Sequence, residues 1–254
     1  MRIALTVEYC GTQFAGWQHQ PAKRTVQDEL ERALSEAAHE PIRVYASGRT
    51  DAGVHALGQV VHFDTQSTVP VAKWPEVVNN LLPPDVSVVD ARAVDEDFHA
   101  RKDAVDKTYV YRIFVAPQPR ATLWDRAWVT KYALDVDAMN RAAVHLVGKH
   151  DFAAFRATGS SAKTTVRTVK ELCVTADADA VTEGGKVVTG GITLRITADG
   201  FLYNMVRVIT AQLALAGQYR RSEQEIAEIL ASGDRARAKE LAPPQGLYLA
   251  HVTY

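Results

Sequence analysis

The sequence predicts an α+β protein built from two ferredoxin-like, split βαβ domains in tandem, each with an antiparallel sheet. Its 254 residues are 47% hydrophobic and 23% charged, which is typical of a packed globular chain with one large or two small domains. Apolar residues alternate with period two in some segments and recur at spacings of three and four in others. The resulting elements run β, α, β, β, α, β twice, which places one domain at 1–105 and the other at 106–254.

The first half of the chain supplies one set of these elements. They are, in order, strand 2–9, helix 25–38, strands 42–47 and 58–64, helix 71–82 and strand 86–94. The first helix carries its apolar residues behind Thr25, whose hydroxyl makes it a good N-cap. The second helix must end before Pro83 and Pro84, because proline lacks the N–H that an interior helix position donates.

The second half repeats the order with larger insertions. Its elements are strand 107–116, helix 135–148, strands 165–176 and 187–198, helices 203–217 and 223–232, and a last strand over 246–254. Ser222 and Glu225 hold capping-box positions before the last helix. The turn-prone segment DADAVTEGG separates the two middle strands. RNA-recognition modules use the same split βαβ arrangement, so the fold is RRM-like as well.

Composition excludes several classes of protein. No apolar run approaches the roughly 18 residues that a membrane helix needs, so we expect no membrane association. The first residues, MRIALTVEY, lead straight into a strand, without the apolar stretch and cleavage site of a secretory signal. Cys10 and Cys173 stand outside any metal-binding spacing and fit a reduced, cytoplasmic setting better than a disulfide framework.

The most informative segment is ASGRTDAGVHALGQVVHFD, residues 46–64. It places glycine, arginine, aspartate and histidine in a loop between two strands, where functional residues often lie. Asp51, followed two residues later by glycine, is also ordinary turn chemistry, so a structural role is one interpretation. A metal-dependent hydrolase using Asp51, His55, His62 and Asp64 is another. No third nitrogen or sulfur ligand has a zinc-like spacing, so we expect no metal.

Motifs along the whole chain point to one family. They are FAGWQHQP at 14–21, GRTDAGVHALGQVVHF at 48–63, FHAR at 98–101, KTYVYRI at 107–113, GKHDFAAF at 148–155, NMVRVI at 204–209 and APPQGLYLAHVTY at 242–254. In this order, and over essentially the full length, the chain resembles the tRNA pseudouridine synthase A family. The resemblance implies the pseudouridine synthase fold and an isomerase that converts uridine to pseudouridine at positions 38, 39 and 40 of the tRNA anticodon stem-loop. It also implies a homodimer that uses neither a cofactor nor a metal.

The same resemblance implies roles for five residues. Asp51 corresponds to the essential catalytic carboxylate, the candidate nucleophile. Arg207, in the MVR motif, resembles the ion-pair partner of that aspartate. Tyr109 corresponds to the aromatic residue that contacts the target base, and Arg49 to an arginine that helps hold the flipped nucleotide. Leu247 corresponds to a residue of the pocket wall.

The chemistry of the reaction fits these residue types. The bond between uracil N1 and the ribose breaks, and the free base rejoins through C5, so the uridine must first leave the helical stack. An ionised carboxylate could attack ribose C1′ or base C6, or remove a sugar proton, and a nearby arginine favours that charged form. Tyr109 offers a flat surface for stacking, although its alternation equally fits a core tyrosine. Arg207 could also be an exposed helix arginine.

A noncatalytic RNA-binding protein with tandem RRM-like domains is the alternative. The basic-Gly-aromatic-Gly-aromatic signature of such modules is missing from the sequence. The 29 basic and 30 acidic residues give a net charge of -1, which taken alone disfavours a nucleic-acid partner. Locally, however, 100–131 has seven basic and three acidic residues, 148–171 has five and two, and 81–99 has one and five. We therefore expect a basic tRNA face and an acidic remote face.

Overall fold

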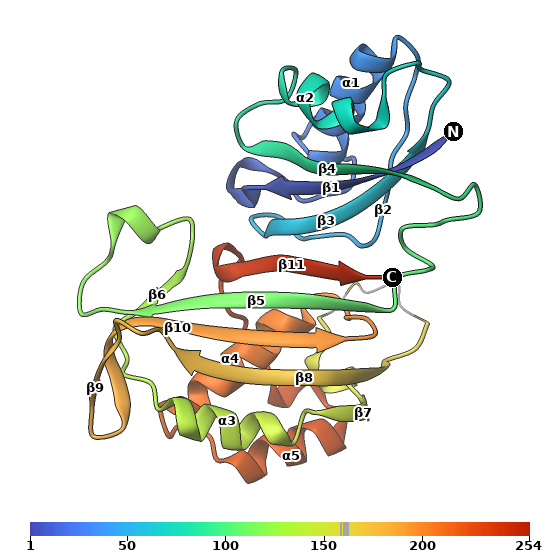
Figure 1. The fold of residues 1–254 in the computed structure, drawn as a ribbon. Helices are drawn as coiled ribbons and strands as arrows, with labels where there is room; N and C mark the ends of the chain where they lie inside the picture. The colour runs from blue at the N-terminus through green and yellow to red at the C-terminus, as the bar shows by residue number, and fades with distance from the viewer. Residues whose placement is uncertain (158, 160–162) are drawn as a thin grey trace. The chain divides into compact units, whose positions relative to one another are not determined.

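The structure is a computed structural model that describes residues 1–157, 159 and 163–254 (Figure 1). It has two compact units, one formed by Met1–Val105 with Tyr248–Tyr254 and the other by Asp106–Leu247. The strands pair mostly antiparallel and are accompanied by few helices, which confirms the predicted α+β class. No helix in the described part of the chain has the length and apolar character needed to cross a membrane.

The first unit follows the split βαβ order. Its elements are β1 (Arg2–Tyr9), α1 (Val26–Ala38), β2 (Tyr45–Ala46), β3 (His55–Asp64), α2 (Trp74–Asn79), β4 (Val86–Val94) and β11 (Leu247–Thr253). Strand β1 lies between β4 and β3, antiparallel to both. The far edge of β3 is shared, because β2 pairs with its C-terminal part and β11 runs parallel to its start. Residues 248–254, expected in the second domain, thus belong to the first unit.

Helix α1 forms where the sequence predicts it. The Thr25 hydroxyl accepts a hydrogen bond from the Asp28 N–H, which satisfies one of the open donors of the first turn. Val26, Leu30 and Leu34 form its fully buried face. The helix ends at His39, whose left-handed backbone (φ 55°) stops the chain from continuing.

Two elements of the first unit are shorter than predicted. Only Tyr45–Ala46 of the expected strand 42–47 pairs with β3. Ile42 and Val44 are buried as alternation requires, but their N–H groups donate to the side chains of Ser35 and Glu31 on α1, so this backbone bonds to a helix and not to a strand. The expected helix 71–82 has a 3₁₀ turn over Val71–Lys73 before α2.

The main strands of the second unit are hydrogen-bonded in the order β5-β10-β8-β7. Its elements are β5 (Asp106–Val115), β6 (Trp128–Thr130), α3 (Val136–Val144), β7 (Gly148–Asp151), β8 (Val166–Ala176), β9 (Val181–Glu183), β10 (Lys186–Ala198), α4 (Met205–Gly217) and α5 (Glu223–Ser232). The three helices pack together on one face of this sheet (Figure 1). The Ser222–Glu225 capping box is confirmed. Strands β6, β7 and β9 were not predicted, and β9 occupies the segment expected to be a turn.

Candidate active site

Asp51 lies in the loop that joins β2 to β3, with its side chain partly exposed. The Val54 N–H donates to the Asp51 carbonyl oxygen at 3.1 Å, and Gly53 has a φ of 78°, which an L side chain would resist. The loop therefore contains the turn that the sequence suggested. That turn is closed by a backbone hydrogen bond. Arg49, two residues earlier, is exposed.

A buried polar network lies beneath this loop. The Ser47 hydroxyl donates to Gln59 Oε1 at 2.7 Å, and Gln59 Nε2 donates to the Gly48 carbonyl at 2.8 Å. The hydroxyls of Tyr9 and Thr50 share a hydrogen bond of 2.7 Å. Burial raises the pKa of Tyr9 to about 12, so its hydroxyl stays protonated at neutral pH. These satisfied bonds fix the part of the loop that precedes Asp51.

The segment around FAGW packs directly against the same loop. The Trp17 N–H donates to the Thr50 carbonyl at 3.0 Å. Gly16 has a φ of 101°, and a Cβ built there would lie 2.8 Å from the Thr50 oxygen. A Cβ on Gly11 would lie 1.9 Å from the Val54 oxygen. Both positions require glycine because the two backbones approach too closely for any side chain.

The two histidines of β3 have structural partners. His55 Nδ1 accepts a hydrogen bond from the Gly11 N–H at 3.1 Å, and its ring stacks on Tyr248 with centroids 4.6 Å apart. His62 Nδ1 accepts one from the Ala100 N–H at 3.1 Å. Each ring is therefore held by the packing of the first unit.

The metal-dependent hydrolase receives no support from this geometry. His55 and His62 are seven residues apart on one strand, which separates them by roughly 23 Å at a rise of about 3.3 Å per residue. Ligands of one zinc ion lie within about 2.3 Å of it. Asp64 forms an ion pair with Arg2 at 2.8 Å. Among the described residues, no group of three or more His, Cys, Asp or Glu could hold a metal ion.

In the second unit, Tyr109 lies on β5 opposite Ile196 of β10. Its side chain is 8% exposed, and its ring meets Phe201 edge-on, with centroids 5.0 Å apart and planes at 83°. Tyr111, two residues along the strand, is fully buried and donates its hydroxyl to the Pro243 carbonyl at 2.7 Å. Tyr111 is thus a core tyrosine, whereas Tyr109 lies at the margin of the core beside a second aromatic ring.

Arg207 lies in the first turn of α4, and its side chain is held by neighbours in the same unit. Nε donates to the Ala242 carbonyl at 2.7 Å, and Nη1 donates to Asn204 Oδ1 at 2.8 Å. The Ala242 N–H returns a bond to the Arg207 carbonyl at 3.2 Å. Arg207 is half-buried and anchored, so the interpretation as an exposed helix arginine is wrong.

Leu247 starts β11 and is buried. The preceding Gly246 lies so close to β5 that a Cβ there would be 2.6 Å from the Tyr111 ring. Tyr109, Arg207 and Leu247 therefore belong to the second unit, and Arg49 and Asp51 to the first.

Sequence reasoning missed the residues that support these side chains. The sequence patterns place Tyr9 and Gln59 only in strands and give Phe201 no role. Gly11 and Gly16 form no recognisable spacing with the loop, which follows more than 30 residues later. Buried polar residues within strand patterns are the one signal that could have indicated Gln59, because a buried amide needs partners.

Comparison with known proteins places the chain. The sequence model of the family described as tRNA pseudouridine synthase matches residues 5–103 and 142–254. The chain belongs to the tRNA pseudouridine synthase family. It is 44% identical over 256 residues to tRNA pseudouridine synthase A of Bacillus subtilis (strain 168), covering 100% of this chain and 99% of that protein. The chain is also 45% identical over 253 residues to tRNA pseudouridine synthase A of Paraburkholderia phytofirmans. That match covers 100% of this chain and 90% of the relative. The relative from Thermoanaerobacter sp. (strain X514) is 40% identical over 252 residues, 99% of each chain.

Proposed function

We propose that this tRNA pseudouridine synthase family member converts uridine to pseudouridine at positions 38, 39 and 40 of the tRNA anticodon stem-loop. Asp51 is its catalytic carboxylate. The observation that carries the proposal is the loop of Asp51: a partly exposed carboxylate on a backbone held by Gln59, Tyr9 and the segment around Trp17. A rigid loop that presents one carboxylate suits a reaction that needs a single, well-placed ionised group.

The reaction is an isomerisation, so its atoms balance within the substrate. The N1–C1′ bond breaks, the uracil turns, and a C5–C1′ bond forms while the C5 proton is lost and N1 gains a proton. Attack of Asp51 on C1′, its attack on C6, and its removal of a sugar proton all require the ionised carboxylate. The carboxylate is released at the end of each route, so no external reagent is consumed.

The remaining residues supply binding and charge in this proposal. Arg207 is the ion-pair partner that keeps Asp51 ionised, and its anchored guanidinium supports that role. Tyr109 stacks the flipped base, a contact worth about 1 to 3 kcal/mol, and Phe201 holds its ring on edge. Arg49 binds the nucleotide from its exposed position, and Leu247 forms part of the pocket wall.

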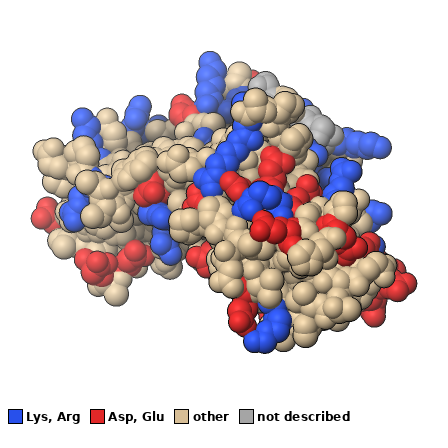
Figure 2. All heavy atoms as spheres, turned by 90° about the horizontal axis from the view of Figure 1, so that it is seen from above, with Lys and Arg blue, Asp and Glu red and all other residues tan. Residues whose placement is uncertain are grey.

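The partner is tRNA, and we propose a cytoplasmic homodimer that needs neither metal nor cofactor. Figure 2 shows Lys and Arg side chains interspersed with Asp and Glu on the face that it draws, in keeping with a net charge near zero. Binding to tRNA then depends on locally basic segments such as 100–131 and 148–171. Light scattering would report a mass near twice 27.9 kDa for a dimer, and a single chain mass would refute it.

One assay tests the function. Unmodified tRNA is incubated with the purified protein in excess EDTA, and pseudouridine is measured at each position of the anticodon stem-loop. We expect product at 38, 39 and 40 without added metal. Binding of tRNA without any product would favour the noncatalytic RNA-binding alternative. Activity that appears only when zinc is added would contradict the metal-free mechanism.

The Asp51→Asn variant tests the carboxylate. It keeps the shape of the side chain and removes the charge, so we expect unchanged stability and tRNA affinity with turnover reduced at least about 1,000-fold, as expected for the loss of the essential group. Thermal unfolding and filter binding check the two controls. Substantial turnover in this variant would remove Asp51 from its proposed role.

A further inference from the structure

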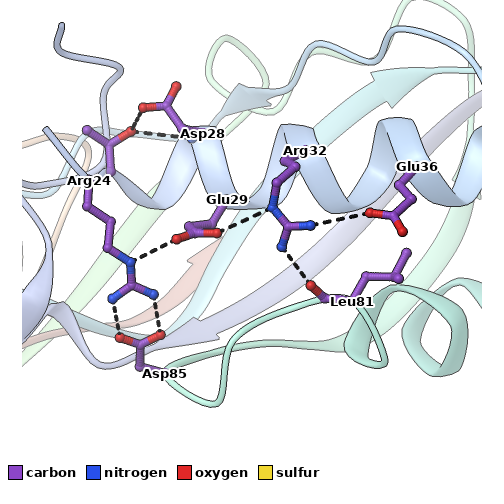
Figure 3. A network of polar contacts seen from close by, with 8 residues as sticks. Arg24, Asp28, Glu29, Arg32, Glu36, Leu81 and Asp85 are labelled. Atoms are coloured by element: carbon purple, nitrogen blue, oxygen red, sulfur yellow. Dashed lines mark hydrogen bonds and ion pairs between the residues drawn. The ribbon is translucent and has the colours of Figure 1, made fainter. Parts of the chain in front are cut away.

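Arg24 is the centre of an ion-pair network in the first unit (Figure 3). Its Nη1 and Nη2 donate to the two carboxylate oxygens of Asp85 at 2.7 and 2.9 Å, and its Nε donates to Glu29 at 2.8 Å. The guanidinium also lies over the Phe14 ring, 4.3 Å from its centroid. Such planar, two-pronged geometry is specific to arginine, because lysine offers only a point charge.

Asp85 holds both ends of the chain segment 10–24. Its carboxylate binds Arg24 at one end, and its backbone carbonyl accepts the Cys10 N–H at 2.9 Å at the other. Inside the segment, the Ala15 N–H donates to the Arg24 carbonyl at 2.9 Å. The segment is therefore a loop whose two ends, Cys10 and Arg24, both bind Asp85. We call the Arg24–Asp85 ion pair the clasp.

The closed segment carries the contacts that fix the loop of Asp51. Gly11 and Gly16 pack on the backbone at Val54 and Thr50, and the Trp17 N–H binds the Thr50 carbonyl. None of these contacts involves Arg24 directly. The clasp joins the two ends of the segment, the Val26 and Gln27 N–H groups also bind its Gly16 and Trp17 carbonyls, and the segment in turn packs on the loop backbone.

We propose that the clasp is a positioning device for Asp51 in the uridine isomerisation proposed above, on which this inference rests. The Arg24 and Asp85 side chains are 37% and 22% exposed, and partly exposed ion pairs contribute little to global stability. Their loss would instead let the segment shift, and a displacement of the carboxylate by about 1 Å can cost about 100-fold in rate. The clasp thus acts on turnover and leaves tRNA binding unchanged.

Arg32 offers a matched control in the same network. It pairs with Glu29 at 3.6 Å and Glu36 at 3.4 Å and donates to the Leu81 carbonyl at 2.7 Å, as Figure 3 shows. It belongs to the same helix as Glu29 and its side chain is 50% exposed, and Glu29, Glu36 and Leu81 all lie outside the segment 10–24. Arg32→Gln therefore removes comparable ion pairs without opening the clasp.

The test compares Arg24→Gln, Arg24→Lys and Asp85→Asn with Arg32→Gln, below the unfolding transition of each protein. We expect kcat for pseudouridine formation to fall at least tenfold in the first three, with the Kd for tRNA unchanged within twofold, and no change in kcat for Arg32→Gln. Lysine should not restore the rate, because it cannot bind both Asp85 oxygens. Hydrogen exchange at the Trp17 and Val54 amides should accelerate in the clasp variants alone.

Unchanged kcat in Arg24→Gln and Asp85→Asn would overturn the proposal, and so would an equal fall in Arg32→Gln, which would indicate general destabilisation. If Arg24→Gln does not fold, Asp85→Asn, which keeps the side-chain shape, decides the matter. If the unaltered protein forms no pseudouridine, the proposed function fails. Hydrogen exchange then reports separately whether the clasp fixes the loop.

Discussion

Several side chains of the candidate site bind backbone carbonyls. Gln59 donates to Gly48, Tyr111 to Pro243 and Arg207 to Ala242. The position of a carbonyl is set by the fold of its segment, so these bonds transfer the geometry of the fold to individual side chains. Preorganisation of this kind lowers the cost of aligning groups at the moment of reaction.

Arg207→Ala tests the proposed ion pair at this scale. Without a nearby cation the ionised form of Asp51 is less favoured, so we expect kcat at pH 7 to fall at least about tenfold and the acidic limb of the pH–rate profile to move to higher pH. Asn204→Ala is the control, because it removes one anchor of Arg207 and keeps the guanidinium. A normal rate in a folded Arg207→Ala protein would refute the ion pair.

His62 gives the first unit a pH-dependent stability. Burial, reinforced by the electrostatic influence of His99 and Arg2, lowers its pKa from 6.5 to about 4. The folded protein therefore keeps His62 neutral between pH 6.5 and 4, while the unfolded chain binds a proton there. This group costs no stability above pH 6.5, and its cost grows as the pH falls, by at most about 1.4 kcal/mol per unit, until it is complete below about pH 4.

Urea unfolding at pH 7.5 and pH 5 measures this effect. The free energy of unfolding should fall more between the two values in the unaltered protein than in His62→Gln, which has no proton to gain. Other titrating groups contribute to both proteins and cancel in the comparison. Equal losses would show that His62 titrates normally in the folded state.

At the scale of elements, the loop of Asp51 is shaped by a segment that is distant in sequence. Segment 10–24 reaches it only because glycine at positions 11 and 16 leaves room for backbone against backbone. The loop and this segment therefore behave as one packed element, although β1, α1 and β2 are the regular structures around them. A substitution that shifts segment 10–24 should therefore also shift the loop of Asp51, and the reverse should hold.

Gly16→Ala tests that coupling. The added methyl would lie 2.8 Å from the Thr50 oxygen at a φ of 101°, so we expect a loss of about 1 to 3 kcal/mol in unfolding free energy and a lower kcat. Gly185→Ala is the matched control, because its φ is 79° and nothing lies within 4 Å of the new atom. The difference between the variants in urea unfolding isolates the contact with Thr50. Equal losses would attribute the effect to φ alone.

The elements also differ in how well the sequence predicts them. The Thr25 cap and the Ser222–Glu225 capping box were correct because each is a contact within three residues. Strand β7 was missed because its pairing with β8 depends on residues about twenty positions away. Asp51 and Arg207 were found through resemblance to a family, whereas the support from Gly16 and Gln59 needed the folded backbone.

At the scale of the whole molecule, the net charge does not describe how charge is distributed along the chain. A net charge of -1 would leave tRNA unattracted if it were spread evenly. The segments 100–131 and 148–171 carry net charges of +4 (7 − 3) and +3 (5 − 2), and 81–99 carries -4 (1 − 5). A polyanion responds to these local fields and not to their total.

Salt dependence tests that statement. We expect the logarithm of the tRNA dissociation constant to rise linearly with the logarithm of the salt concentration, with affinity falling at least about tenfold between 50 and 200 mM. Replacing Lys149 and Arg167 with glutamine should reduce the slope, and replacing Asp95 and Asp97 with asparagine should not. Filter binding at four salt concentrations measures this slope. A dissociation constant that does not change with salt would rule out an electrostatic tRNA face.

The position of β11 has a consequence for how the protein is made. Tyr248 stacks on His55 at the end of the loop that carries Asp51, and the Thr253 carbonyl accepts a hydrogen bond from the Val105 N–H. A ribosome translates these residues only after 106–247, although they complete the sheet of the first unit. Until then the start of β3 is an open strand edge, and His55 lacks its stacking partner. The loop of Asp51 therefore gains the support of Tyr248 only after residues 106–247 have been translated, and a nascent chain that stops short of β11 lacks this support.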